Sequence, residues 1–531
     1  MPDRREFLKQ GAGALGAAAL AARADARPTA QAPVPPRPAR ADMLVGAWYF
    51  PGWNAADQWY CIAAHPAVQR PLLGYYDQDN PLAADWHVVW ALEHGVSFFA
   101  YCYYTEGGTQ WLEGALDLGL LRSRFIDRFR FCLLWCNHAP AERMTAREFR
   151  EFSDLAVRKY LAHPSYLRVN GKPLVMILAG YHFVQTLGVE GARQAFAGLD
   201  ERCKRLGLGG VTLMFAEGGI MSEQAVRDSL AAGAHALVLY NFPYAGTKVT
   251  GPGPGSGAEA SYEHLVEQGI GLWKHWRSLS GGRFWPTVMT GWDRRPWTKD
   301  QDLIRTDSTP ELFERSLRAA REHVDGDRAV MIAAWNEWAE GSALEPSVEH
   351  RFAYLDRVRS VFCPGAGPHT DRRPTESQRR ALSFRVELPH IEAWRFHRTA
   401  DGWTRTGADE LRFDAGALRT VSRSGDPQLT SPASYVPCAR YRAVRLRMRA
   451  ACPPGGPEAA TGQLFWSTVD HELSEGASVT FRVPLDGEWH EHTLDVGSHP
   501  RWHGMLHRFR LDPADRADVA IDLDEVVLVR R

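Results

Sequence analysis

The 531-residue sequence lacks an excess of charge of either sign, since 62 Lys and Arg residues stand against 63 Asp and Glu residues. A protein that binds nucleic acid or an anionic membrane through its surface charge normally carries a basic excess. We therefore predict no nucleic-acid partner. Aromatic residues are plentiful instead, with 19 Trp and 16 Tyr. Flat rings of this kind suit sugar faces as well as protein cores.

The eight cysteines include no Cys-x-x-Cys pair, and Cys102, Cys132 and Cys136 lie inside apolar runs. These positions favour buried thiols over a disulfide framework. The spacings give little support to a zinc site, and we predict no metal.

The N-terminus is typical of an export signal. Arg4 and Arg5 precede an apolar run at 11–22 that is too short to span a bilayer, so we predict no membrane span. Residues 1–24 therefore resemble a twin-arginine signal peptide, which implies the export machinery as a partner and a periplasmic or secreted protein. Residues 25–42 are Pro-rich and predict an extended linker.

Eight short apolar runs alternate with helix-compatible segments between residues 43 and 363. The runs are 43–50, 95–104, 129–136, 172–179, 210–217, 234–242, 284–293 and 329–338. Runs without polar alternation are typical of parallel strands buried on both faces. The pattern predicts an α/β fold, a (β/α)8 TIM barrel. A doubly wound open sheet is the alternative, although no Gly-rich phosphate loop follows the first run.

The residues at the strand ends are mostly aromatic, amide or acidic, and a TIM barrel carries its chemistry at the C-terminal ends of its strands. We predict that they bind the substrate. They are Tyr49, Trp53, Tyr103, Tyr104, Trp135, Asn137, His138, Glu217, Tyr240, Trp292, Asp293, Trp335 and Asn336.

The last run ends in AAWNEWAEGSALEP, residues 333–346, where Glu337 and Glu340 are three residues apart. Glycoside hydrolysis commonly uses two carboxyl groups, one of which protonates the leaving oxygen. Residues three apart on a helical turn are close neighbours, so this pair could act on one substrate. The alternative is that both glutamates cap the next helix, which would not explain the flanking Trp335 and Trp338.

This motif resembles the C-terminal signature of the glycoside hydrolase family 99-like group, also called WbsX. The segments GAWYFPGWN, PLLGYYDQDNP, HGVSFFAYCYY, LRVNGKPLVMI and PTVMTGWDRRP resemble other parts of that group in the same order. The resemblance implies a glycosidase related to endo-α-mannosidases that retains configuration through a 1,2-anhydro sugar. It implies that Glu337 acts as base on the substrate's 2-hydroxyl and Glu340 as general acid/base. It implies no metal and no organic cofactor, and we expect a structural role for Glu345.

Two segments depart from the group's pattern. CLLWCNHAP keeps Asn137 but replaces the acid and second Trp that usually follow, and YYTEGGTQWLEG replaces a loop with a basic tip. The sugar preference of the group therefore does not carry over. Glu106 and His138 are candidates for replacement contacts.

Residues 364–380 are polar and rich in Pro and Gly, and predict a linker. Short alternating segments at 381–531 then predict an all-β sandwich that resembles carbohydrate-binding accessory domains. Trp466, Trp489 and Trp502 are candidate stacking platforms for sugars, or core residues of a sandwich that braces the barrel. We interpret Asp512, Asp522 and Asp524 as ordinary turn acids rather than calcium ligands.

Together these features predict an exported glycoside hydrolase with a carbohydrate substrate. A WbsX-type glycosyltransferase is one alternative, although export would separate it from cytoplasmic nucleotide sugars and no Asp-x-Asp element is present. A non-catalytic glycan-binding protein on a degenerate barrel is another, although both glutamates are retained.

Overall fold

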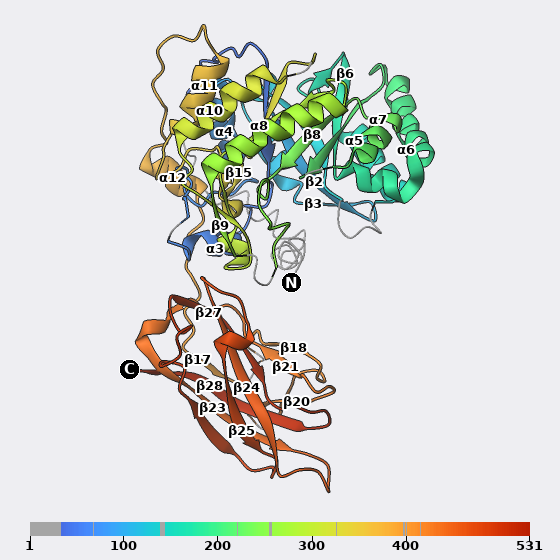
Figure 1. Ribbon diagram of the computed structural model, residues 1–531. Coiled ribbons are helices and arrows are strands. Elements are labelled where there is room, and N and C mark those ends of the chain that lie inside the picture. Colours follow the sequence, from blue (N-terminus) through green and yellow to red (C-terminus); the bar gives the residue numbers. More distant parts are fainter. Residues whose placement is uncertain are drawn as a thin grey trace.

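The structure is a computed structural model that describes residues 33–531, except residues 67, 138–143, 220, 254–256, 325, 397, 398, 400 and 415. A helix-wrapped barrel is followed by a β-sandwich (Figure 1). The predicted signal peptide lies outside the described residues. In the described part of the predicted 25–42 linker, the backbone N–H of Arg37 donates to Glu93 Oε1 at 3.0 Å, so this segment packs on the barrel.

The barrel is a ring of parallel strands. Its strands are β1 (Leu44–Tyr49), β2 (Phe98–Glu106), β4 (Arg130–Trp135), β6 (Lys172–Leu178), β7 (Thr212–Gly218), β8 (Ala236–Asn241), β10 (Phe284–Trp285), β11 (Thr287–Met289) and β14 (Ala329–Ala333). They follow chain order around the sheet, and β1 pairs with β14. The seventh strand is split at Pro286, which has no N–H to donate to a ladder. Its first half, β10, pairs with β8 and its second half, β11, with β14, which closes the ring. The predicted (β/α)8 barrel is confirmed.

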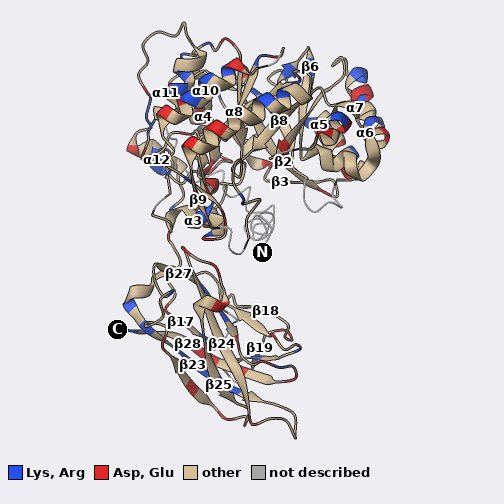
Figure 2. Cartoon of the chain, viewed as in Figure 1, with Lys and Arg blue, Asp and Glu red and all other residues tan. Residues whose placement is uncertain are grey.

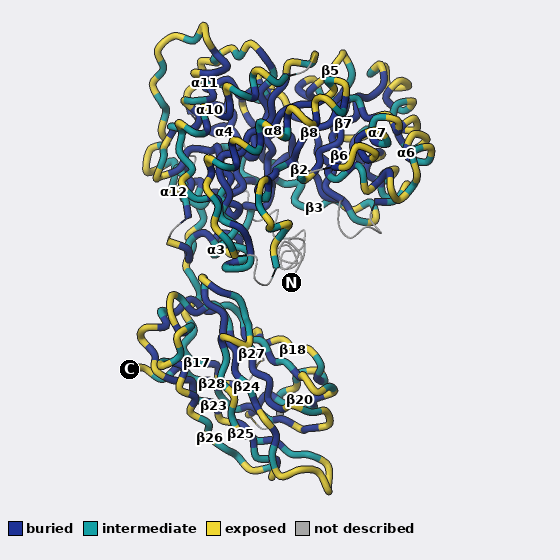
Figure 3. The backbone as a smooth tube through the Cα atoms, in the orientation of Figure 1, coloured by how far each residue is buried: buried dark blue, intermediate teal, exposed yellow. Residues whose placement is uncertain are grey.

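The helices cover the outside of the ring. They are α4 (Pro81–Glu93), α5 (Ala146–Lys159), α6 (Gly180–Arg205), α7 (Glu223–Ala231), α8 (Tyr262–Leu279), α10 (Pro310–Glu322) and α11 (Ala353–Phe362). Thr309 caps α10, because its side chain accepts from the backbone N–H of Leu312. Acidic and basic residues are interspersed on the helices (Figure 2), and the strands form the buried centre (Figure 3).

Successive side chains of each strand face opposite sides of the barrel wall. Trp48 faces the interior, where its ring lies 5.4 Å from that of Tyr240 on β8, a strand that is not a neighbour of β1. Tyr49 therefore faces the helices, and its hydroxyl lies 3.0 Å from His87 Nδ1 on α4. This alternation decides which strand-end residues can meet a ligand in the interior.

Short elements complete the barrel domain. They are α3 (Tyr60–Ala63), α9 (Arg295–Thr298), α12 (Glu376–Leu382), β3 (Thr109–Trp111), β5 (Arg168–Val169), β9 (Glu259–Ser261), β12 (Trp292–Asp293), β13 (Ile304–Thr306), β15 (Asn336–Glu337) and β16 (Ser342–Ala343). Helix α12 lies at the end of the predicted 364–380 linker and is held on the barrel, since the backbone N–H of Asp77 donates to Leu382 O at 3.1 Å. The first sandwich strand begins at Ala393, within the predicted 381–531 domain.

The C-terminal domain is a sandwich of two antiparallel sheets, as predicted. One contains β17 (Ala393–Arg395), β19 (Arg412–Asp414), β20 (Ala417–Val421), β23 (Tyr441–Ala451), β26 (His490–Leu494) and β28 (Ala520–Arg530). The other contains β18 (Thr404–Thr406), β21 (Gln428–Thr430), β22 (Val436–Pro437), β24 (Ala459–Thr468), β25 (Ser478–Pro484) and β27 (Met505–Asp512).

The tryptophans of the sandwich divide between core and surface. Trp466 and Trp502 are buried in the core, which favours the bracing interpretation for both. Trp489 is only partly buried and lies within cation–π distance of the Arg447 and Arg449 guanidinium groups, at 4.9 and 5.0 Å.

The sandwich contacts the barrel through a charged cluster at the end of α9. Lys299 Nζ lies 3.1 Å from His507 Nδ1 and 3.4 Å from Glu472 Oε2. Burial lowers the pKa of Lys299 to about 8, against the opposing effect of Glu472. Both sandwich residues thus meet a lysine that belongs to the loop after β12.

The eight cysteines all lie within the described residues and form no disulfide; six of them are buried, in agreement with the predicted buried thiols. Within the described ranges, no helix combines the length and the apolar character that crossing a bilayer requires.

Candidate active site

The predicted catalytic glutamates lie on a tight hairpin after the last barrel strand. Strands β15 and β16 pair antiparallel, and Trp338–Glu340 forms a 3-10 turn between them. Glu337 directly precedes this turn and Glu340 is its last residue, so both glutamates belong to the same short hairpin. Gly341 adopts φ 60°, and a Cβ there would lie 2.7 Å from the backbone nitrogen of Asp293. The hairpin therefore packs directly on the loop that follows the seventh strand.

Glu337 is only 1% exposed and contacts Tyr240 of β8, which is separated from β14 by the split seventh strand. The Tyr240 hydroxyl donates to Glu337 Oε1 at 3.1 Å, and Cys102 Sγ lies 3.8 Å from the same hydroxyl. A hydrogen bond from a neutral hydroxyl stabilises the ionised form of a carboxylate. Tyr240 thus favours the state in which Glu337 can accept a proton.

Glu340 is 4% exposed and lies beside a cation, since Arg294 Nε is 3.7 Å from Glu340 Oε1. Arg294 also donates to Asp302 Oδ2 at 3.2 Å. Its guanidinium lies 5.5 Å from the ring centre of Trp292 and 5.9 Å from that of Trp297. The two carboxyl groups therefore have different partners, one a hydroxyl and the other a guanidinium.

Arg294 and Asp302 are site residues that the sequence prediction missed. Burial raises the pKa of the Asp302 carboxyl, against the lowering effect of Arg294. A signal for Arg294 was present, because it directly follows Asp293 in the W-D-R-R segment at the end of the seventh strand. No local pattern connects it with Glu340.

Asn336 and Trp53 join the hairpin to the first strand. The Asn336 side chain accepts from the Phe50 backbone N–H and donates to the Phe50 carbonyl, both at 2.8 Å. Trp53 Nε1 donates to the Asn336 carbonyl at 3.0 Å. The polar atoms of these two predicted substrate-binding residues are thus engaged with the backbone.

Five other predicted substrate-binding residues pack in the layer between the strands and the helices. The Tyr49 hydroxyl meets His87, Tyr103 packs on Phe152 and Tyr160, Trp135 stacks on Phe152, Trp335 packs on Phe99 and His87, and Glu217 accepts from the backbone N–H of Tyr181. The sequence prediction chose these residues because each lies at a strand end, and it could not tell which face of the barrel wall each side chain occupies.

Glu217 is the one carboxylic acid among these five residues, and its pKa is strongly raised. Burial raises the pKa of its carboxyl to about 8, although the N–H groups of Tyr181 and Gly180 at the start of α6 act in the opposite direction. At neutral pH this carboxyl is therefore mostly protonated.

Four of the remaining predicted residues lie at or beside the end of β2, or in the loop after the seventh strand. Tyr104 pairs with Trp111 of β3, and Asn137 Oδ1 accepts from the Thr105 N–H at 3.3 Å. Trp292 contacts Arg294, and Asp293 forms an ion pair with Arg295 at 2.6 Å. His138 lies outside the described residues.

Glu345 supports the hairpin from behind. Its Oε2 accepts from the Tyr76 hydroxyl at 2.6 Å and from Trp338 Nε1 at 3.3 Å, while His87 Nε2 lies 3.2 Å from Oε1. These contacts agree with the expected structural role.

The comparisons with known proteins place the chain in a family. The model described as "Glycosyltransferase WbsX" matches residues 53–358. A protein WxcX of Xanthomonas campestris pv. campestris is 26% identical over 309 residues, which are 55% of this chain and 42% of that protein. The WxcX protein of strain B100 is 25% identical over 313 residues, with the same two shares. The chain thus spans less than half the length of these relatives.

Solved structures give weaker likenesses. A "Glycoside hydrolase-like protein" has 17% identity and a TM-score of 0.47, and the match covers 62% of this chain and 97% of the other. The GH99 endo-alpha-mannosidase from Bacteroides thetaiotaomicron has 17% identity and a TM-score of 0.43, with coverage of 60% and 96%. A carbohydrate binding module of family 29 has 13% identity and a TM-score of 0.19, with coverage of 26% and 89%.

Proposed function

The chain belongs to the WbsX family, which is described as a glycosyltransferase family, and from this premise we propose that it is an enzyme acting on glycans, specifically a glycoside hydrolase. The bond cleaved is a glycosidic bond in a polysaccharide or glycan. The observation that carries the proposal is the pair of buried carboxyl groups, Glu337 and Glu340, on one hairpin at the catalytic end of the barrel.

Glu337 acts as the base. It takes the proton from the substrate's 2-hydroxyl, whose oxygen attacks the anomeric carbon and forms a 1,2-anhydro sugar. The Tyr240 hydrogen bond supports this role, because it stabilises the ionised carboxylate before the proton arrives.

Glu340 acts as the general acid/base. It protonates the leaving oxygen in the first step and takes a proton from water in the second. That water opens the anhydro ring with overall retention, while Glu337 returns its proton to the 2-oxygen. Arg294 lies 3.7 Å from Glu340 Oε1 and 3.2 Å from Asp302 Oδ2, so it helps to position the Glu340 carboxyl group. No step in this sequence requires a metal or an organic cofactor.

A glycosyltransferase is the second candidate, because the family carries that description. Both candidates form or break a glycosidic bond, so the same two carboxyl groups could serve either. The acceptor decides between them: water in a hydrolase, a sugar hydroxyl in a transferase. A glycan-binding protein without catalysis is the third outcome.

We also propose that the protein is periplasmic or secreted. The support is the twin-arginine pattern at Arg4 and Arg5 with its short apolar run. An exported enzyme would meet polysaccharides but not cytoplasmic nucleotide sugars.

A product assay tests the function. Residues 25–531 are incubated with bacterial, fungal and plant polysaccharides, beside the Glu337→Gln/Glu340→Gln double variant. New reducing ends with the wild type alone support hydrolysis. Product that forms only with a nucleotide-sugar donor supports the transferase. Equal glycan binding by both proteins without product supports the binding protein.

A further inference from the structure

Two histidines and two aspartates meet at the end of the barrel away from the hairpin. His94 directly follows α4, Asp356 lies on α11, and His369 and Asp371 lie in the segment between α11 and α12. In Figure 1, α11 lies at the end of the barrel far from the sandwich, whereas α3, which contacts the Trp338–Glu340 turn, lies near the sandwich. The cluster is therefore separate from the proposed active site.

The donor atoms lie at a characteristic spacing. His94 Nε2 is 3.5 Å from Asp371 Oδ1 and 3.6 Å from Asp356 Oδ1, and His369 Nε2 is 3.6 Å from Asp371 Oδ1. One donor atom from each of His94, His369 and Asp371 falls within a group no wider than 4.8 Å. These distances are longer than a good hydrogen bond. Ligands about 2.0–2.2 Å from a tetrahedral zinc ion lie about 3.4 Å from one another, which is close to the observed values.

The orientation of His94 provides an independent argument. Its side chain is 0% exposed, and Nδ1 lies 2.7 Å from the Trp90 carbonyl, which only an N–H at Nδ1 can satisfy. In the neutral imidazole the lone pair is then on Nε2, which lies nearest the two aspartates and has no hydrogen-bond partner among the described residues. A metal-binding histidine typically donates its other N–H to a carbonyl in this way.

The cluster also has an outer layer and an opening. Glu93 Oε2 lies 3.9 Å from His369 Nε2, while Glu93 Oε1 is held by Arg372 at 3.0 Å. Asp356 and Asp371 are partly exposed, so an ion can enter from solvent.

We propose that His94, His369 and Asp371 bind a zinc ion. Mixed imidazole and carboxylate donors suit zinc, and a water molecule would complete a tetrahedral shell around three protein ligands. The site joins the end of α4 to the segment after α11. That segment also holds the N-terminal residues, because Arg372 donates to the carbonyls of Val34 and Pro35 at 2.8 Å.

The rival occupant is a proton. A protonated His94 would place a positive charge between Asp356 and Asp371 and would need no metal. The two occupants differ in metal uptake, because only a zinc site takes up the added ion. They also differ in the role of His369, which would be a zinc ligand but is not needed to hold a proton on His94.

Zinc titration of the chelator-treated chain, residues 25–531, tests the proposal by calorimetry at pH 7.5. We expect one zinc per chain with a Kd of about 1 µM or tighter, and a rise in Tm on zinc addition. The His369→Ala/Asp371→Ala variant should bind at least about 100-fold more weakly and lose the rise. Because this variant could misfold, His369→Gln is measured beside it, with far-UV circular dichroism as a check.

The matched control is His490→Ala/Asp486→Ala in the sandwich, which removes an exposed His–Asp pair whose atoms lie 3.0 Å apart. This variant should keep full zinc binding. Cobalt in place of zinc should give the strong visible absorption of a tetrahedral site, and it should be lost in both His369 variants. No zinc uptake by the wild type, or equal uptake by the wild type and folded His369→Gln, would overturn the proposal and leave the proton as the occupant.

Discussion

Replacing Glu217 with glutamine is expected to stabilise the barrel at alkaline pH and to have no such effect at acidic pH. The wild-type carboxyl has a pKa of about 8 in the fold against an ordinary value of 4.5, because it is buried. Between these two pH values the folded chain binds more protons than the unfolded chain. The free energy of unfolding of the wild type therefore falls as the pH rises from 4.5 to 8.

The magnitude follows from the two pKa values. At 1.36 kcal/mol for each pKa unit, holding an ionised carboxylate at this position costs about 5 kcal/mol once the pH exceeds 8. Glutamine keeps an oxygen that can accept from the Tyr181 N–H and carries no charge. For a barrel of this size, that difference corresponds to about 5–10 °C in Tm.

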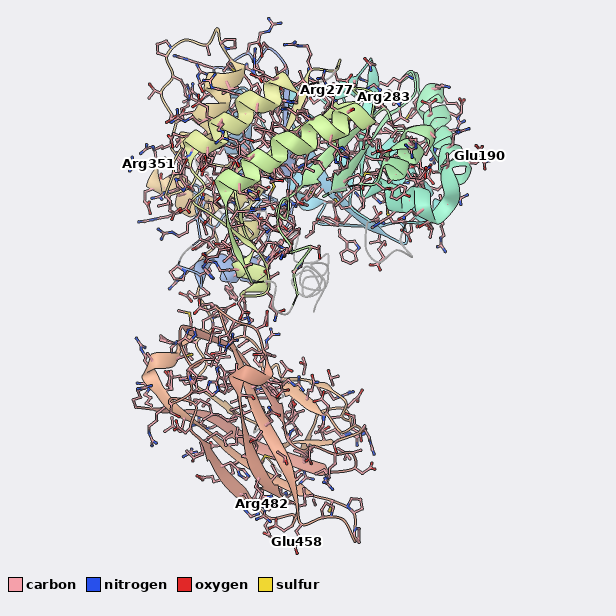
Figure 4. The ribbon with its side chains drawn as sticks, viewed as in Figure 1. Glu190, Arg277, Arg283, Arg351, Glu458 and Arg482 are labelled. Carbon is pink, nitrogen blue, oxygen red and sulfur yellow. The ribbon has the colours of Figure 1, made fainter. Side chains whose placement is uncertain are left out.

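Thermal unfolding at pH 5 and pH 9, followed by circular dichroism at the helix signal, measures the effect in the barrel, which holds the long helices. The difference in Tm between Glu217→Gln and wild type should grow by several degrees from pH 5 to pH 9. Glu190→Gln is the matched control, since Glu190 lies at the outer surface of α6, the helix whose first N–H groups face Glu217, and should show no such growth (Figure 4). A constant difference for Glu217→Gln would refute the reasoning, because the N–H groups at the start of α6 would then stabilise the carboxylate as well as water does.

Three further predictions concern the hairpin. Glu340→Gln should abolish activity on unactivated glycosides and spare part of it on substrates with good leaving groups, whereas Glu337→Gln should impair both kinds alike; steady-state kinetics on both substrate types checks this, and equal losses in Glu340→Gln would contradict its role as acid. Tyr240→Phe removes a hydrogen bond to a carboxylate worth about 1.5–3 kcal/mol, so kcat/KM should fall about 10- to 100-fold with an unchanged circular dichroism spectrum; an unchanged rate would remove Tyr240 from the mechanism. Glu345→Gln should lower Tm, because it weakens a charge-assisted bond from Tyr76 that costs about 1–3 kcal/mol to lose; unchanged unfolding would show that this contact contributes little.

The barrel could be predicted because its signal is local and repeated. Strands buried on both faces are continuous apolar runs, and eight of them with helical segments between leave few other folds. The hairpin glutamates could be predicted equally well, since both lie in one short motif whose polar residues are not explained by packing in an apolar core.

The faces of the strands could not be predicted for the same physical reason. A run that is apolar on both sides shows no alternation, so the sequence does not distinguish Trp48, which faces the interior, from Tyr49, which faces the helices. Only the pairing of β1 with its neighbours fixes that choice.

Contacts between distant segments were also invisible. Arg294 meets Glu340, and His94 meets His369, only after the chain has folded. The two residues of each pair are too far apart in the sequence to form a short motif, whereas cysteine and histidine ligands a few residues apart would have been recognised.

The contact of Lys299 with Glu472 and His507 limits how freely the two domains could be exchanged between proteins. Lys299 ends the same loop that carries Arg294, so the sandwich contacts the loop whose arginine lies beside Glu340, the proposed acid. A barrel fused to a different accessory domain would leave a buried amine without its carboxylate and free that loop to shift. Recombination would then preserve this site only if the new domain supplied an equivalent acid.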